Sequence, residues 1–290
     1  MAKEASAIVG QIRFEEEQTV WKAKVDDELA SYYQGAVHPG MMFTLAKKRM
    51  EGTKLWQIVK KMPKGALLHC HFEAMIDQDW LFREAIDTKG LHLWSNGTFE
   101  DQAGRDNHEI IFGFRSKAQA AGASIWTKEY VNHSAVPLAE AAQSYPEGGR
   151  EGFIRWLRSR CSISPKESIS HHQGPCQIWS KFISYFSVLR TLVYYEPIYR
   201  KSLSRMFHQL AEDGIQYVDL RAAMHFDFNP EGSEKPLEQE EGRLEAIRIL
   251  GEEVEKFQAT EQGKDFWGAR MIWTSIRSFD NRTICESKCC

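Results

Sequence analysis

Residues 62–72 read MPKGALLHCHF, and the interpretation of the whole chain depends on them. The proline and glycine end the helical pattern before them, and the short apolar run that follows predicts a buried strand. Side chains two positions apart on a strand point to the same face. His69 and His71 can therefore reach one metal ion. An H-x-H pair also occurs by chance, so two histidines that bind nothing are the alternative.

The composition is that of an ordinary globular protein. The chain has 290 residues, 42% of them hydrophobic, with 37 Lys+Arg against 40 Asp+Glu. The formal net charge of −3 argues against a polybasic nucleic-acid binder. No stretch reaches the ~18 consecutive apolar residues of a membrane helix, so no membrane association is expected. The first residues lack the apolar core of a secretory signal, which predicts a cytoplasmic location.

The six cysteines do not suggest a disulfide framework, because they are sparse and three of them lie in residues 285–290. A C-x3-C-C ending without an accompanying histidine or second cysteine pair is a poor zinc motif. We therefore expect these last residues to form an atypical cysteine-rich tail of reduced thiols.

Hydrophobic periodicity predicts helices that alternate with single apolar strands, which is typical of a parallel α/β sheet. Residues 1–61 are expected to be a helical extension, and 95–175 are the least regular part of the chain. The strands are expected near residues 66–72, 215–221 and 266–277, and the main helices at 79–89, 178–210 and 238–256.

Three segments resemble one protein family. MPKGALLHCHFEAMIDQDWLF is similar to the opening strand of the adenosine deaminase-related growth factors, the adenosine deaminase 2-like branch of the metal-dependent amidohydrolases. AEDGIQYVDLRAA and FWGARMIWTSIR resemble the second and third strands of that family, and the aromatic helix from Trp179 to Leu210 precedes them. The resemblance implies the N-terminal part of a TIM-like (β/α)8 barrel over residues 62–284, with about three strands and a helical insertion near 95–175. The helical extension 1–61 would then support a homodimer.

The resemblance also implies a reaction, the zinc-assisted deamination of adenosine or a related 6-aminopurine nucleoside. His69 and His71 would supply two zinc ligands. Glu73 stands where related deaminases place an aspartate that contacts the ribose, and a solvent-facing glutamate is the alternative. Trp179 would line the nucleoside pocket, unless it is simply a core residue. Asp219 and Arg221 could be an ion pair at a strand end or part of the site, and the structural interpretation is favoured.

The chain departs from the family after its third strand. It contains no H-x-G-E stretch with the catalytic glutamate, and no counterpart of the later histidines or the Asp-Asp pair. Five further βα units would need ~150 more residues. We therefore expect a truncated deaminase that is inactive alone and folds poorly. The alternative is a non-catalytic fragment or an interaction and dimerisation protein. Animal members of the family are often extracellular, which leaves the location open.

Overall fold

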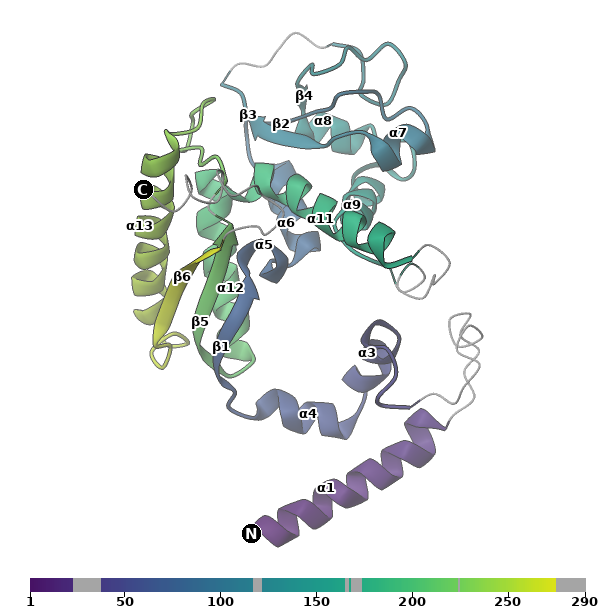
Figure 1. Ribbon diagram of the computed structural model, residues 1–290, viewed down its shortest axis with the longest axis vertical. Coiled ribbons are helices and arrows are strands. Elements are labelled where there is room, and N and C mark those ends of the chain that lie inside the picture. The colour runs from purple at the N-terminus through teal and green to yellow at the C-terminus, as the bar shows by residue number, and fades with distance from the viewer. Residues whose placement is uncertain (23–37, 117–121, 165–166, 168–173, 224, 275–290) are drawn as a thin grey trace. The chain divides into compact units, whose positions relative to one another are not determined.

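The computed structural model describes residues 1–22, 38–116, 122–164, 167, 174–223 and 225–274 (Figure 1). Contacts between residues divide the chain into two compact units. One comprises residues 1–64 and 163–181, and the other comprises 65–162 and 182–290. The predicted cysteine-rich tail at 285–290 lies outside the described residues.

Most of the described N-terminal part of the first unit is helical. Its helices are α1 (Ala2–Glu16), the π-helical turn η1 (Glu17–Trp21), α3 (Phe43–Glu51) and α4 (Lys54–Lys61). The side-chain oxygen of Thr53 accepts a hydrogen bond from the backbone N–H of Trp56 (3.1 Å), which caps α4. Trp21, Met41 and Ala46 form a small core of their own.

The second unit is built on a three-stranded parallel sheet with the order β1-β5-β6. Its strands are β1 (Gly65–His71), β5 (Ile215–Ala223) and β6 (Gly268–Thr274). Helices α12 (Glu196–Glu212) and α13 (Gln239–Gln258) pack beside the sheet (Figure 1). The predicted α/β fold with about three parallel strands is therefore confirmed, and each strand lies where the apolar runs predicted it.

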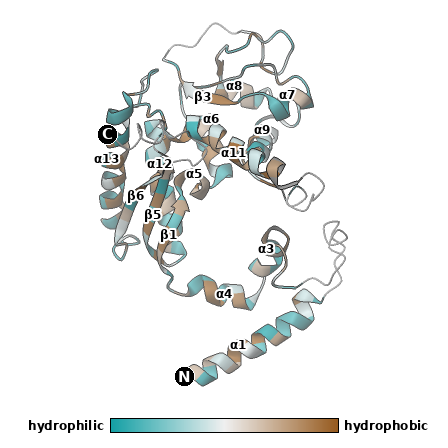
Figure 2. Cartoon of the chain, viewed as in Figure 1, coloured by the Kyte–Doolittle hydropathy of each residue, from teal (hydrophilic) through white to brown (hydrophobic). Residues whose placement is uncertain are grey.

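The central strand β5 has one apolar and one polar face. Val218, Leu220 and Ala222 are buried in the main core, as alternation along a strand requires. Asp219 and Arg221 alternate with them and are half-buried on the opposite face. Figure 2 shows hydrophobic and hydrophilic residues together along α12 and α13, as expected of helices with one side against a core.

The aromatic segment expected as one helix from 178 to 210 forms two. Helix α11 (Gly174–Val193) ends before Tyr194, and α12 starts at Glu196 with a proline in its first turn. Proline fits there because the first amides of a helix have no partner within it. Tyr195 adopts an extended conformation at the break.

The region expected as a helical insertion also contains strands. An antiparallel sheet of order β3-β2-β4 joins β2 (Leu91–Trp94), β3 (Ile111–Phe114) and β4 (Val136–Pro137). The surrounding helices are α6 (Gln78–Asp87), α7 (Gln102–Asn107), α8 (Leu138–Gln143) and α9 (Gly149–Arg160). These strands have four residues at most, at or below the shortest run in which alternation becomes visible, so periodicity does not reveal them.

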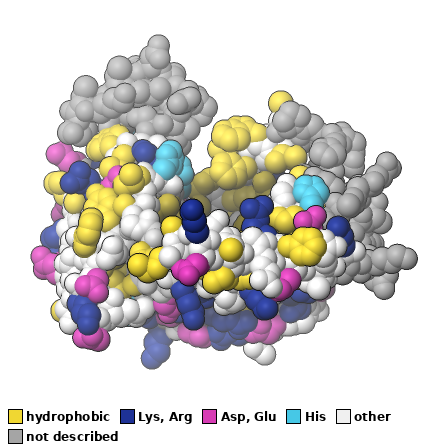
Figure 3. All heavy atoms as spheres, turned by 90° about the horizontal axis from the view of Figure 1, so that it is seen from below, with side chains coloured by type: hydrophobic (Ala, Val, Ile, Leu, Met, Phe, Trp, Pro, Cys, Tyr) yellow, Lys and Arg dark blue, Asp and Glu magenta, His cyan; other side chains and the backbone are white. Residues whose placement is uncertain are grey.

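Some hydrophobic side chains are exposed, as the yellow atoms in Figure 3 show on one face. Among them are Ile8 and Phe14 of α1 and Trp267, which lies just before β6. Within the described part of the chain, none of the helices combines the length and the apolar character needed to cross a bilayer.

Candidate functional site

The two histidines of the H-x-H pair lie at the carboxyl end of β1. Their ring centroids are 5.8 Å apart, with an interplanar angle of 54°. His69 is exposed and His71 is half-buried. Burial lowers the pKa of His71, and the nearby His69 and Arg221 lower it further. A lowered pKa keeps the imidazole of His71 neutral, which is the form that binds a metal ion.

The surroundings of His71 combine apolar and basic side chains. His71 lies beside Arg221 of β5 in the parallel register. The ring of Phe186, from α11, meets the His71 ring edge-on at 6.1 Å, and Phe182 packs on Phe186 at 5.2 Å. The Nε atom of Arg221 is buried and has no hydrogen-bond partner among the described residues. His69 and His71 therefore lie beside a half-buried surface on which the Nε–H of Arg221 is a hydrogen-bond donor without a partner among the described residues.

The cysteine between the two histidines is turned away from this surface. Cys70 is buried, and its thiol donates to the carbonyl oxygen of Asp219 at 3.5 Å. Burial, with a contribution from the Asp219 carboxylate, raises its pKa to about 11. A thiol of such high pKa is almost wholly protonated at neutral pH, so Cys70 is a poor nucleophile and metal ligand.

Asp219 and Arg221 do not form the ion pair that the sequence suggested, within the described part of the chain. The carboxylate of Asp219 instead accepts a hydrogen bond from the Tyr217 hydroxyl at 2.7 Å. The three side chains alternate with the buried positions of β5 and share its polar face. The polar face therefore presents a basic group and a carboxylate at separate positions.

Glu73 belongs to α5 (Phe72–Met75), the short helix that follows β1 directly. Its side chain is buried, with only 6% of the residue exposed. The hydroxyl of Tyr194 donates a hydrogen bond to its Oε1 at 2.9 Å. Burial raises the pKa of Glu73, while a hydrogen bond from its own backbone amide, the Tyr194 hydrogen bond and the charge of Arg190 lower it to a smaller extent. The structure therefore places Glu73 in the core and not at a solvent-facing strand end.

Trp179 lies on α11 and is 62% exposed, so it is not a core residue in the described structure. It belongs to the first unit, whereas His69, His71 and Glu73 all belong to the second. His69 and His71 lie side by side at the end of β1, while Glu73, two residues further along the chain, is buried against Tyr194. The adjacent histidines at 171 and 172, which the sequence gave no role, lie outside the described residues.

Zinc in catalytic sites takes three protein ligands, commonly including histidines. The described residues contain no group of three or more His, Cys, Asp or Glu side chains arranged to hold a metal ion. His69 and His71 are thus of the right chemical type for zinc but supply only part of a complete set.

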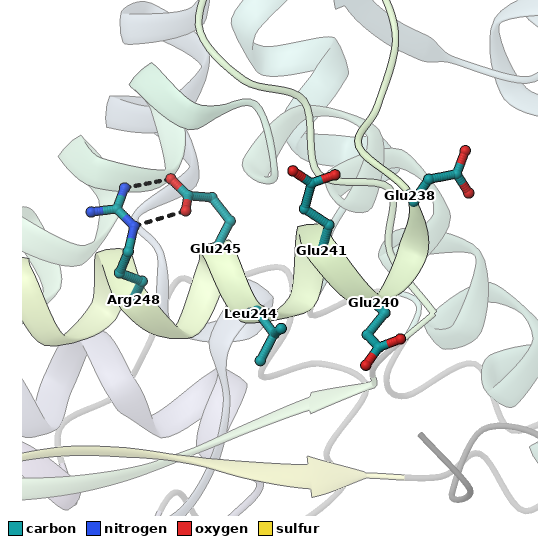
Figure 4. A pocket seen from close by; sticks show the side chains of 6 residues that line it. All are labelled: Glu238, Glu240, Glu241, Leu244, Glu245 and Arg248. Atoms are coloured by element: carbon teal, nitrogen blue, oxygen red, sulfur yellow. Dashed lines mark hydrogen bonds and ion pairs between the residues drawn. The ribbon is translucent and has the colours of Figure 1, made fainter.

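A separate hollow lies along the first turns of α13, away from these residues in the sequence. Its lining consists mainly of glutamates, together with one leucine and one arginine: Glu238, Glu240, Glu241, Leu244, Glu245 and Arg248 (Figure 4). Arg248 Nε donates to the Glu245 carboxylate at 2.8 Å, so the one basic residue of the lining is engaged. The hollow contains none of the predicted site residues.

Sequence reasoning missed the role of Tyr194. The residue was recognised only as part of an aromatic helix, yet its hydroxyl is the hydrogen-bond partner of Glu73 across 121 positions of sequence. No local pattern links the two residues, because a contact of this separation is created by the fold alone.

Comparison with known proteins extends the resemblance. No family model matches the chain. An adenosine deaminase of Phlebotomus duboscqi is 26% identical over 246 residues, which is 84% of this chain and 42% of that protein. Adenosine deaminase 2-A of Danio rerio is 27% identical over 85% of this chain and 44% of its own length. Adenosine deaminase 2 of Homo sapiens is 25% identical over 86% of this chain and 44% of its own length.

The chain is similar to the adenosine deaminase 2-like proteins. This confirms the resemblance inferred from residues 62–72 and from the two later strands. The chain spans well under half the length of these relatives, between 42% and 44%. That coverage is consistent with the predicted match to an N-terminal portion.

Proposed function

We propose that this chain is part of an adenosine deaminase-like hydrolase, which converts adenosine and water to inosine and ammonia. The observation that carries the proposal is the pair His69 and His71, with centroids 5.8 Å apart at the carboxyl end of a parallel strand. Similarity to proteins named adenosine deaminase over more than four-fifths of the chain supports it. Active sites of β/α barrels are built at this end of the strands.

In this proposal β1, β5 and β6 are the first three strands of a TIM-like barrel. The polar face of β5 would then line the interior of the barrel, and the buried apolar face already packs in the main core. Eight βα units close such a barrel. The remaining units, with the other zinc ligands and the catalytic glutamate, would be supplied from outside the described residues.

His69 and His71 would hold a zinc ion together with those further ligands. A zinc ion held there would lower the pKa of its bound water towards ~7 and so supply hydroxide at neutral pH. The lowered pKa of His71 favours the neutral imidazole needed for this contact. Phe186 packs edge-on against His71 and shields that side of the ring from water. Glu73 would accept a hydrogen bond from a ribose hydroxyl.

Zinc affinity tests the proposal directly. The purified chain is titrated with Zn2+ in competition with a chromophoric chelator, and the His71→Ala and His69→Ala variants are compared with His133→Asn. His133 is exposed at φ 62°, a backbone conformation that asparagine tolerates, so this control removes an imidazole at little structural cost. We expect each site variant to weaken zinc binding at least ~10-fold, as loss of one of few ligands should. Equal losses in all three variants would contradict the assignment.

Deaminase activity provides a second readout. Inosine formed from adenosine is measured by chromatography for the 290-residue chain in the presence of Zn2+. We expect no turnover, because the sequence has no H-x-G-E glutamate to protonate the purine ring. Turnover that disappears in His71→Ala would show that this chain carries a complete site and would correct the expectation of inactivity.

A second candidate function is an interaction module that forms a homodimer through residues 1–61. Ile8 and Phe14 of α1 are largely exposed, which favours a helix that packs against a partner. Light scattering on the full chain tests this candidate. An Ile8→Asp/Phe14→Asp variant should shift a dimer towards a monomer, while an unchanged mass would argue against this surface.

A further inference from the structure

Glu73 is a carboxylate in an environment that normally excludes carboxylates. It is 6% exposed and stands among the buried residues at the start of α5. A buried carboxylate is tolerated only when hydrogen-bond donors satisfy its oxygens. The donor that the structure supplies therefore has a strong influence on where this side chain, and the backbone that carries it, can lie.

Besides the backbone amide of Glu73 itself, the donor is Tyr194, whose ring is fixed on several sides. Tyr194 is 1% exposed and donates to Glu73 Oε1 at 2.9 Å. The ring of Phe226 stacks on it almost in parallel, at 3.8 Å and 5°. The Phe72 ring lies 6.0 Å away at a tilt, and the Tyr199 ring lies 5.8 Å away. A donor held this firmly can hold its acceptor in place.

Strand pairing alone fixes this part of β1 less well. The register between β1 and β5 shifts between Leu67 and Cys70, so the regular ladder is interrupted beside His69. Regular pairing resumes only at Cys70 and His71, the last two residues of the strand. Helix α5 then has only four residues. The end of β1 thus needs an anchor from outside the ladder.

We infer that Tyr194 is a positioning residue, which acts through Glu73 to fix the end of β1 and with it the rings of His69 and His71. The first part of this inference, that Tyr194 orders residues 69–75, does not depend on any ligand. The consequence for metal affinity rests on the proposed function. Partners beyond the direct ligands typically change metal affinity by 10–100-fold when they are removed.

The structure offers a matched control. Tyr199 is also fully buried in the same aromatic group, but its hydroxyl donates to the backbone oxygen of Ala246 at 3.1 Å. Tyr194→Phe and Tyr199→Phe each remove one buried hydroxyl and one hydrogen bond, and only the first contact involves Glu73. A third variant, Glu73→Gln, keeps an oxygen that can accept from Tyr194 while it removes the charge.

Hydrogen exchange of the metal-free full chain, resolved to residues 69–75, is the first measurement. Tyr194→Phe should speed exchange in this segment about 10-fold or more, since the carboxylate loses its hydrogen bond to α11–α12 and keeps only that to its own backbone amide. Tyr199→Phe and Glu73→Gln should leave the segment within about 3-fold of the parent chain. Equal acceleration by both tyrosine variants, or acceleration spread evenly over the whole chain, would overturn the inference.

Zinc affinity of the same proteins is the second measurement. We expect Tyr194→Phe to weaken binding by about 10–100-fold and Glu73→Gln to retain most of it. If the parent chain binds no zinc but the exchange result holds, the proposed function fails while the positioning role stands. If zinc binds through the histidines and the exchange of 69–75 does not change, the positioning role fails and the proposed function stands.

Discussion

Replacing Phe226 with alanine should lower the free energy of unfolding by about 3–5 kcal/mol, the usual cost of removing a fully buried aromatic ring. Phe226 is 1% exposed, and its ring stacks on Tyr194 at 3.8 Å. The loss is the sum of the transfer free energy of the ring and the cost of the cavity that it leaves. The cavity remains because Tyr194 and its neighbours are closely packed and cannot move far enough to fill it. Stabilities of single domains are about 5–15 kcal/mol, so this change is a large fraction of the total.

Urea denaturation followed by tryptophan fluorescence measures the effect, with two reference variants. Phe226→Leu keeps an apolar side chain but loses the stacked ring, so we expect a loss of about 1–2 kcal/mol. Trp267→Ala removes a ring that is 75% exposed and should change the unfolding free energy by no more than ~0.5 kcal/mol. We expect the largest loss of unfolding free energy for Phe226→Ala, a smaller loss for Phe226→Leu and the smallest for Trp267→Ala.

A loss below about 1 kcal/mol for Phe226→Ala would refute the claim that this ring is closely packed in the core, because removing such a ring costs considerably more. An equal loss for the alanine and leucine variants would locate the whole effect in the stacking of the rings and none in the cavity. A large loss for Trp267→Ala would show that this exposed ring packs against something in solution, and it would no longer serve as a surface reference.

Three further results are expected. Peptide-resolved alkylation at pH 8 should label the exposed Cys176 well before Cys161, whose thiol has its pKa raised to about 12 by burial and is only ~0.01% thiolate at that pH. Thermal unfolding should show that Gly113→Ala destabilises the chain by about 1–3 kcal/mol, since the Cβ of the new alanine would lie 2.5 Å from a facing tryptophan ring. Gly10→Ala places its Cβ in open space on a helix, so this variant should be neutral or stabilising. Burial raises the pKa of Glu73 above 4.5, so the folded chain binds this proton more tightly than the unfolded chain does. The free energy of unfolding should therefore fall as pH rises from 4.5 through the raised pKa. In urea titrations at several pH values, Glu73→Gln should remove this part of the pH dependence.

The main sheet could be predicted from sequence because its strands carry strong local signals. The first follows a proline and a glycine, and the second follows an Asp-Gly turn, and both runs are apolar over several residues. The pair His69 and His71 could be found as well, since two positions of spacing on a strand give one face directly. These signals fix where each strand lies along the chain, whereas the assignment of the three runs as the first, second and third strands of a barrel came from the resemblance.

The second sheet and the partner of Glu73 could not be predicted, for a different reason. Strands β3 and β4 have four and two residues, so they are held by pairing with β2 and by packing more than by any pattern of their own. The break between α11 and α12 has a visible proline, but only the structure shows that Tyr194 at this break turns into the core. Contacts between distant residues decide such features, and a single sequence does not encode them locally.

The polar face of β5 links the fold to the proposed chemistry. Strands of parallel sheets are usually buried on both faces and read as continuous apolar runs. β5 instead alternates, with Asp219 and Arg221 between the buried positions, and Arg221 keeps a buried Nε without a partner among the described residues. Packing alone would favour apolar residues at both positions, because a buried polar atom without a hydrogen-bond partner, such as the Nε of Arg221, is costly. Polar groups beside His71 on this face are therefore better explained by a site that binds a polar ligand than by a core, and β/α enzymes place such a site at this end of their strands.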